Sequence, residues 1–194
     1  MTGLLPGLDE IAEIGRDPRR GGYSRHLWQH ADRELRDWLT ERAVRLGLSV
    51  EIDRNGNTWA WWGPRGDDAV VVGSHLDSVP GGGAYDGPLG VVSALDAIAR
   101  LKARAFRPSR PCALLVFAEE EGSRFGIACL GSRLMTGALD PVRARTKPER
   151  KHRNPLVRKS VHVFADYYGS TPQRDSCGQQ QLAAIEIRRW IDEL

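Results

Sequence analysis

The chain has 194 residues, few cysteines and no long apolar run. Its three cysteines (Cys112, Cys129 and Cys177) are scattered and match neither a disulfide framework nor a metal-ligand spacing. No stretch approaches the run of about 18 apolar residues that a membrane-spanning helix requires. The first residues, MTGLLPGLDEIAEIGRD, carry acids where a signal peptide needs a basic start and an apolar core. We therefore expect a cytoplasmic protein with no membrane contact.

Charge is distributed unevenly along the chain. The net charge is +3, but residues 1–140 hold 17 basic and 19 acidic residues, whereas residues 141–194 hold 11 and 6. The length fits one domain with an appendage. We expect a folded part over 1–140 and a basic tail over 141–194 that is disordered or irregular, apart from one short helix over 181–194.

The first part alternates helical and strand patterns. Apolar spacing predicts helices over 4–14, 31–46 and 89–103, and strands over 49–53, 58–62, 69–73 and 112–118. The last two strands are continuous apolar runs, typical of strands buried on both faces. This order indicates an α/β fold with a largely parallel central sheet flanked by helices. In such sheets, sites form beyond the carboxyl ends of the strands.

One polar group follows the 69–73 strand, in GSHLDSVPGGGAYDG. His75 leaves the strand, and Asp77 lies two residues on, where its carboxylate can accept the second ring N–H and fix the tautomer. Asp86 follows three glycines that let the backbone fold back toward His75, and a carboxylate can bridge two divalent ions. The alternative is that His75 ends a strand and the rest is only a turn.

A second polar group, Glu119–Glu121, follows the 112–118 strand. Three adjacent carboxylates repel one another unless a cation lies close. One can ligate a metal while its neighbour accepts a proton from an activated water. The alternative is a solvated first turn of a helix, which the helix dipole favours. Together with His75 and Asp86 at the neighbouring strand end, the pattern favours a two-metal site.

These two motifs resemble a known family. GSHLDSVPGGGAYDGPLGV and AEEEGSRFGIACLGSRLMTG are similar to the dinuclear-metal amidohydrolases, which include N-carbamoyl-L-amino-acid hydrolases, β-ureidopropionases and allantoate amidohydrolases. The segments GGYSR, ADRELRDWLTERAVRLGL and VEIDRNGNTWAWWG also resemble this group, so the resemblance covers about residues 4–140, the N-terminal part of the catalytic domain. The Trp-rich segment resembles the allantoate branch.

The resemblance implies roles for five residues. His75, Asp86 and Glu121 are the implied metal ligands, with Asp86 bridging two ions of Zn²⁺ or Mn²⁺. Asp77 orients His75, and Glu120 is the general base. The implied reaction is attack of metal-activated water on a ureido or amide carbon of a small molecule.

The sequence also departs from the family. A further histidine in a motif resembling HIEQGP, a last histidine near the C-terminus and a lid and dimerisation domain are absent, although family members are homodimers. His152 lies in a cationic stretch and His162 in Ser-Val-His-Val-Phe, and we expect neither to replace a ligand. We therefore expect a truncated or frameshifted product with weakened metal binding and no turnover.

Two other functions are compatible with the same motifs. The first is a catalytically dead fragment that serves as a binding or interaction protein, and the second is an aminoacylase or peptidase of the same superfamily. The basic stretch over 143–159 would attract phosphates, but it lacks aromatic residues and a recognition motif, so we expect no nucleic-acid binding. Ser74 and Ser78 have no base beside them except His75, which argues against a serine hydrolase.

Overall fold

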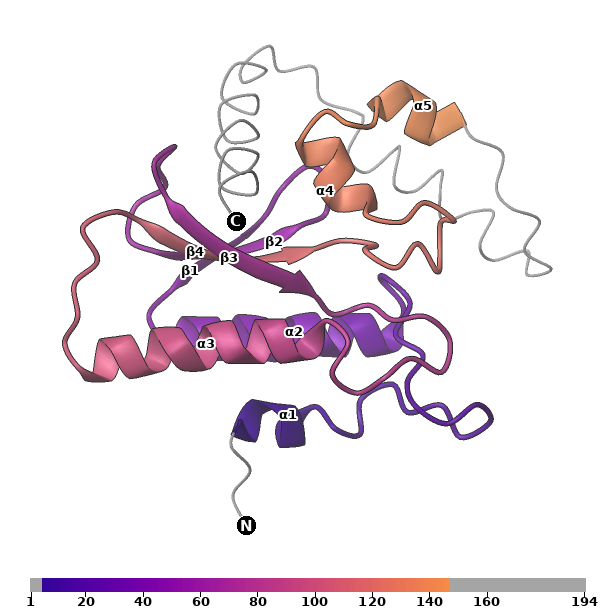
Figure 1. Cartoon of the computed structure of the whole chain (residues 1–194), viewed down its shortest axis with the longest axis horizontal. Helices are drawn as coiled ribbons and strands as arrows, with labels where there is room; N and C mark the ends of the chain where they lie inside the picture. Colours follow the sequence, from indigo (N-terminus) through magenta and orange to yellow (C-terminus); the bar gives the residue numbers. More distant parts are fainter. Residues whose placement is uncertain (1–4, 147–194) are drawn as a thin grey trace.

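The computed structural model describes residues 5–146, which form one sheet with helices on both sides (Figure 1). The strands are β1 (Ser49–Ile52), β2 (Thr58–Trp62), β3 (Val70–His75) and β4 (Cys112–Phe117). The helices are α1 (Pro6–Glu10), α2 (His30–Arg45), α3 (Pro88–Ala103), α4 (Leu130–Met135) and α5 (Pro141–Thr146). Helices α2 and α3 cover one face, α1 lies beyond them, and α4 lies on the opposite side (Figure 1). The α/β class expected from the sequence is confirmed.

The sheet is mixed rather than largely parallel, which corrects the sequence-based expectation. Its strand order is β1-β2-β4-β3. Strands β1 and β2 pair antiparallel because a short turn at 53–57 joins them, and β2 pairs antiparallel with β4. Only β3 and β4 are parallel among the described strands, since α3 provides the crossover between them. That one pairing brings the carboxyl ends of β3 and β4 to the same edge.

Strand β3 lies at the edge of the described sheet. Within residues 5–146 it pairs with β4 alone, and Val70 and Val72 are 44% and 45% exposed. The expectation that this strand is buried on both faces is therefore wrong. The same expectation is confirmed for β4, which lies between two strands and has four fully buried residues.

Two apolar clusters hold the sheet. The larger packs α2 and α3 on one face through residues that include Leu35, Leu39, Leu95, Leu114 and Val116. The smaller lies on the other face, where Trp59 and Trp61 stack with ring centroids 5.2 Å apart. Full burial of one Leu or Val stabilises a fold by about 1.5–3 kcal/mol, so the larger cluster dominates.

The segment between α1 and α2 packs against the loop that follows β3 (residues 76–87, called here the β3 loop). Tyr23 and Gly82 exchange two backbone hydrogen bonds, of 3.0 and 2.9 Å. The backbone N–H of Arg25 donates to Ser78 Oγ (2.9 Å), and the N–H of Ser78 donates to the Arg25 carbonyl (3.0 Å). The Arg25 guanidinium is buried, donates to carbonyl oxygens of the turn that follows α1 and lies over the Tyr23 ring. These contacts fix the β3 loop.

Several elements differ from the sequence-based prediction. The helix expected over 4–14 is shorter, since α1 ends at Glu10. Helix α4 is not predicted, and α5 begins the tail in regular structure where irregular structure is expected. The helix predicted over 181–194, His152 and His162 lie outside the described residues. Within residues 5–146, no helix combines the length and apolar character needed to cross a membrane.

Candidate metal centre

His75 is the last residue of β3, and its ring is largely buried at the sheet edge. Its Nε2 atom lies 3.5 Å from Glu120 Oε2 and 3.8 Å from Asp86 Oδ1. Its Nδ1 atom lies 3.1 Å from the carbonyl oxygen of Asp77. Gly87 packs against the ring, because a Cβ there would lie 2.6 Å from His75 Cε1 and Nδ1. Nε2 is therefore the nitrogen that faces the carboxylates of Glu120 and Asp86.

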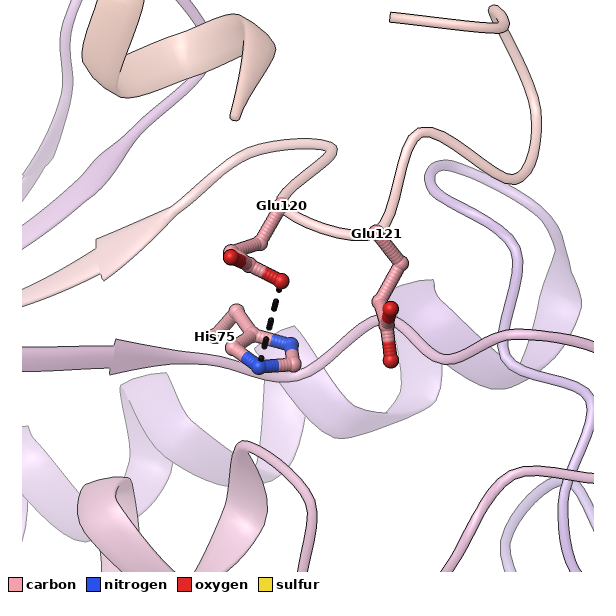
Figure 2. A group of neighbouring side chains, drawn as sticks. All are labelled: His75, Glu120 and Glu121. Carbon is pink, nitrogen blue, oxygen red and sulfur yellow. Dashed lines mark ion pairs between the residues drawn. The ribbon is translucent and has the colours of Figure 1, made fainter. Parts of the chain in front are cut away.

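Glu120 and Glu121 come from the loop after β4 (residues 118–129, called here the β4 loop). One ligand atom each of His75, Glu120 and Glu121 lies within 4.8 Å of the others. Figure 2 shows the Glu120 carboxylate directed at the His75 ring, with Glu121 beside it. Asp86 lies outside this group of three, and its side chain is 61% exposed. The predicted ligands thus gather at one place, with Asp86 at its rim.

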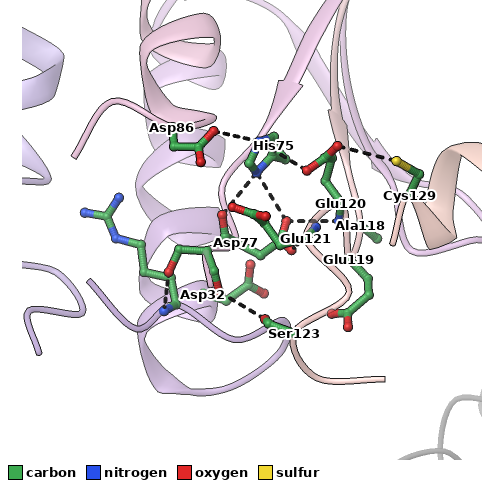
Figure 3. A network of polar contacts seen from close by, with 12 residues as sticks. Asp32, His75, Asp77, Asp86, Ala118, Glu119, Glu120, Glu121, Ser123 and Cys129 are labelled. Atoms are coloured by element: carbon green, nitrogen blue, oxygen red, sulfur yellow. Dashed lines mark hydrogen bonds and ion pairs between the residues drawn. The ribbon is translucent and has the colours of Figure 1, made fainter. Parts of the chain in front are cut away.

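Asp77 is fully buried and contacts both loops. Its Oδ1 lies 3.6 Å from His75 Nδ1, farther than the backbone carbonyl that also faces this nitrogen. The same carboxylate accepts hydrogen bonds from the backbone N–H groups of Glu120 (3.3 Å, to Oδ1) and Glu121 (3.1 Å, to Oδ2). Asp77 therefore does more than the orientation of His75 that the resemblance implies, because it also holds the β4 loop in place (Figure 3).

Asn57 supports the β4 loop from the side of β2. Its side chain is fully buried, and its Oδ1 accepts a hydrogen bond from the backbone N–H of Ala118 (3.0 Å). Its Nδ2 donates to the carbonyl oxygen of Gly131 (3.3 Å) and to Asp53 Oδ2 (2.9 Å). Gly131 leaves room for it, since a Cβ there would lie 2.1 Å from Asn57 Oδ1. The sequence indicates only a turn at 55–57, because Ala118 and Gly131 are 61 and 74 residues away along the chain.

Glu119 plays a structural part in the β4 loop. It is fully buried, and its Oε1 accepts hydrogen bonds from the backbone N–H groups of Arg124 (2.8 Å) and Phe125 (2.6 Å). Burial raises the pKa of Glu119 to about 7, and the negative charge of Asp77 adds to this. The β4 loop contains turns rather than a helix, and α4 begins only at Leu130. The solvated helical turn considered for Glu119–Glu121 is therefore wrong.

The electrostatics of the site favour a cation. Burial lowers the pKa of His75, but the carboxylates of Asp77 and Glu120 outweigh it and raise that pKa to about 9. Burial and the neighbouring charges of Asp86 and Glu120 raise the pKa of Glu121, although His75 opposes this. The carboxylates thus favour a positive charge at this place, which a divalent ion would supply.

The residues present fit a divalent metal. Glu121 Oε1 is buried and has no hydrogen-bond partner in the described structure, and such an orphaned carboxylate oxygen is what a cation satisfies. Imidazole nitrogen with carboxylate oxygens is a donor set that Zn²⁺ and Mn²⁺ both accept.

The serine hydroxyls near the site serve the backbone. Ser78 Oγ donates to Tyr23 O (3.2 Å), and Ser123 Oγ donates to Ser78 O (3.0 Å) while contacting His26 Nδ1 (3.0 Å). The bond from Ser123 to Ser78 joins the β4 loop to the β3 loop, and the contact of Ser123 with His26 joins it to the segment between α1 and α2. The sequence carries no local sign of it, since the two residues are 97 positions apart.

Comparison with known proteins identifies relatives of this chain. Residues 57–151 match the family described as Peptidase family M28. A ureidoglycolate hydrolase of Oryza sativa subsp. japonica is 40% identical over 144 residues, which make up 73% of this chain and 30% of that protein. The chain is homologous to these hydrolases.

Two further relatives extend the homology. An N-carbamoyl-L-amino acid amidohydrolase of Geobacillus stearothermophilus is 36% identical over 140 residues, 71% of this chain and 34% of that protein. The crystal structure of a hydantoinase/carbamoylase family amidase from Burkholderia ambifaria superposes with a TM-score of 0.70 at 31% identity, covering 84% of this chain and 39% of that one. The chain therefore spans only 30–39% of the length of these relatives. The family resemblance seen in its motifs is confirmed.

Proposed function

We propose that this chain carries the N-terminal part of a metal-dependent amidohydrolase that cleaves linear C–N bonds of ureido or amide compounds. One observation carries the proposal: His75, Glu120 and Glu121 converge within 4.8 Å at the carboxyl ends of the parallel strands β3 and β4. Homology to a ureidoglycolate hydrolase and an N-carbamoyl-L-amino acid amidohydrolase supports a small ureido or carbamoyl substrate. Allantoate is the third candidate, from the sequence resemblance.

In this proposal His75 Nε2, Glu121 and Asp86 would hold the two divalent ions, Zn²⁺ or Mn²⁺. Bound there, such ions supply Lewis-acid chemistry that polarises the carbonyl group and lowers the pKa of water. Asp77 keeps the His75 ring in place through Nδ1, so that Nε2 stays directed at the carboxylates.

Glu120 is the proposed general base. Its Oε2 faces His75 Nε2 at 3.5 Å, on the side where the ligands gather. There it accepts a proton from the attacking water, whose oxygen forms the new bond to the substrate carbon. The C–N bond then breaks, and Glu120 returns the proton to the departing nitrogen. General acid–base catalysis of this kind contributes about 10²–10⁴-fold to the rate.

The test uses the purified chain, stripped of metal and then titrated with Mn²⁺ or Zn²⁺. In contrast to the loss of turnover that the absent family ligands imply, the proposal predicts metal binding and release of ammonia from ureidoglycolate, allantoate or an N-carbamoyl-L-amino acid. Glu120→Gln should abolish turnover but keep metal binding, whereas Glu41→Gln, an exposed glutamate on α2, should change neither. Turnover that survives chelation, or that survives Glu120→Gln, contradicts the proposal.

A second candidate is a binding or interaction protein without turnover. Within the described residues, His75 is the one histidine in the group of candidate ligands, so the metals there lack further imidazole donors. Failure to bind two ions, together with absence of turnover in the assay above, favours this candidate.

A peptidase or aminoacylase is a third, supported by the match to Peptidase family M28. The same assay decides it. Hydrolysis of N-acyl amino acids or dipeptides, without hydrolysis of ureido compounds, favours the peptidase over the amidohydrolase.

A further inference from the structure

Cys129 occupies an unusual backbone conformation next to the candidate base. It directly precedes α4, with φ 57° and ψ 34°, the left-handed region that few residues other than glycine adopt. Such conformations persist only where surrounding contacts impose them, and they gather at functional sites.

Backbone hydrogen bonds impose this conformation. The N–H groups of Cys129, Leu130 and Gly131 donate to the carbonyls of Glu120 (2.7 Å), Glu119 (3.1 Å) and Ala118 (2.9 Å). The start of α4 therefore runs against the beginning of the β4 loop and fixes its backbone. As a result, the Cys129 side chain is directed toward the carboxylate of Glu120.

The thiol contacts one oxygen of that carboxylate. Cys129 Sγ lies 3.4 Å from Glu120 Oε1, a hydrogen-bond distance for a sulfur donor. The other oxygen, Oε2, lies 3.5 Å from His75 Nε2. Figure 3 shows Glu120 between the two, with Cys129 on the side away from His75. The two carboxylate oxygens thus have different neighbours.

We infer that Cys129 is a positioning residue for Glu120: its thiol donates to Oε1 and so keeps Oε2 directed at the metal ligands. The inference rests on the proposed function, because it gives Glu120 the role of base. Burial and the adjacent Glu120 carboxylate also raise the pKa of the Cys129 thiol, which keeps it protonated and able to donate.

Substitutions separate this role from a purely structural one. Cys129→Gly keeps the backbone N–H, suits the left-handed conformation and removes the CH2–SH side chain. Cys129→Ser keeps a hydroxyl donor. We expect Cys129→Gly to retain the melting temperature and metal affinity but to lose about tenfold in kcat with little change in KM. Cys129→Ser should recover most of that loss. Unchanged kcat in Cys129→Gly overturns the inference.

A second measurement needs no turnover. The rate at which iodoacetamide alkylates Cys129, followed by peptide mapping, is compared between the wild-type chain and Glu120→Gln. Loss of the neighbouring charge favours the thiolate, and we expect alkylation to accelerate about threefold to tenfold. Cys112, at the start of β4, is the internal control and should react at the same rate in both chains.

The two measurements distinguish the possible failures. If the wild-type chain turns over no substrate but Glu120→Gln accelerates alkylation of Cys129 alone, the contact is upheld and the proposed function is wrong. If the alkylation rate of Cys129 is the same in both chains, the thiol does not contact Glu120 and the inference is overturned, whatever the activity.

Discussion

Replacing Gly87 with alanine tests whether the shape of the β3 loop holds the His75 ring. Gly87 precedes α3 with φ 83° and ψ −61°, a backbone conformation that penalises any side chain. A Cβ at this position would lie 2.6 Å from Cε1, Nδ1 and the carbonyl oxygen of His75. Because real Cβ contacts are longer, either the ring or the start of α3 must move.

The cost of Gly87→Ala has two parts. An L-residue at positive φ costs about 1–2 kcal/mol, and forcing a methyl group into a packed position costs about 1–3 kcal/mol. Their sum, about 2–5 kcal/mol, corresponds to a fall in melting temperature of about 4–20 °C for a chain of this size. Displacement of the ring should also weaken divalent-metal binding about 10–100-fold.

Gly83→Ala is the matched control. Gly83 lies in the same loop, and a Cβ there meets no atom within 4 Å. Thermal unfolding and calorimetric titration with Mn²⁺ or Zn²⁺ are measured for both variants. We expect Gly83→Ala to match the wild-type chain and Gly87→Ala to fall below it in both assays. A Gly87→Ala variant with wild-type stability and metal affinity would refute the reasoning.

Three more predictions concern charge at the site. Because the pKa of Glu119 is raised to about 7 in the folded chain, its carboxyl lowers the free energy of unfolding as pH rises from 4.5 to 7. In the wild-type chain the free energy of unfolding should fall by up to about 3 kcal/mol across that window, and Glu119→Gln should remove this fall. Urea unfolding at pH 5 and pH 8 measures it, and an equal pH dependence in both chains contradicts the prediction. The pKa of His75 is raised to about 9 in the folded, metal-free chain, above its value of 6.5 in the unfolded chain. The charged ring therefore stabilises the fold fully below pH 6.5, and this stabilisation is lost as pH rises through 9. Metal binding at pH 7.5 should accordingly release about one proton, seen by calorimetry in buffers of different ionisation enthalpy, and His75→Gln should abolish this release. Asp77→Asn should weaken metal binding about 10–100-fold by calorimetric titration, and wild-type affinity would exclude its positioning role.

The sequence predicts the elements of this fold better than their arrangement. Alternation over 49–53 and 58–62 and the apolar runs over 69–73 and 112–118 each correspond to a strand, because side-chain pattern and local backbone are directly related. Which strands pair, and in which direction, depends on contacts between distant residues. The run over 69–73 therefore predicts burial on both faces, whereas β3 lies at the edge of the described sheet with two exposed valines.

The same division holds for the site. His75, Asp77, Glu120 and Glu121 are found in the sequence because each follows a strand in a charged motif, and the structure brings them together. Their placement as metal ligands, orienting carboxylate and base remains a prediction. Residues that support them from elsewhere in the chain carry no local signal, and Asn57 is the clearest example, since its partners Ala118 and Gly131 lie 61 and 74 residues away.

The buried carboxylate of Asp77 explains how a mixed sheet can still form this site. The site needs only that β3 and β4 be parallel neighbours, because both polar loops then leave the same edge. Parallel pairing places the loops near each other but does not set the distance between their side chains. Asp77 sets it, by facing His75 from within one loop while accepting two backbone hydrogen bonds from the other. The antiparallel strands β1 and β2 affect the site through Asn57, which contacts the backbone of Ala118 and Gly131.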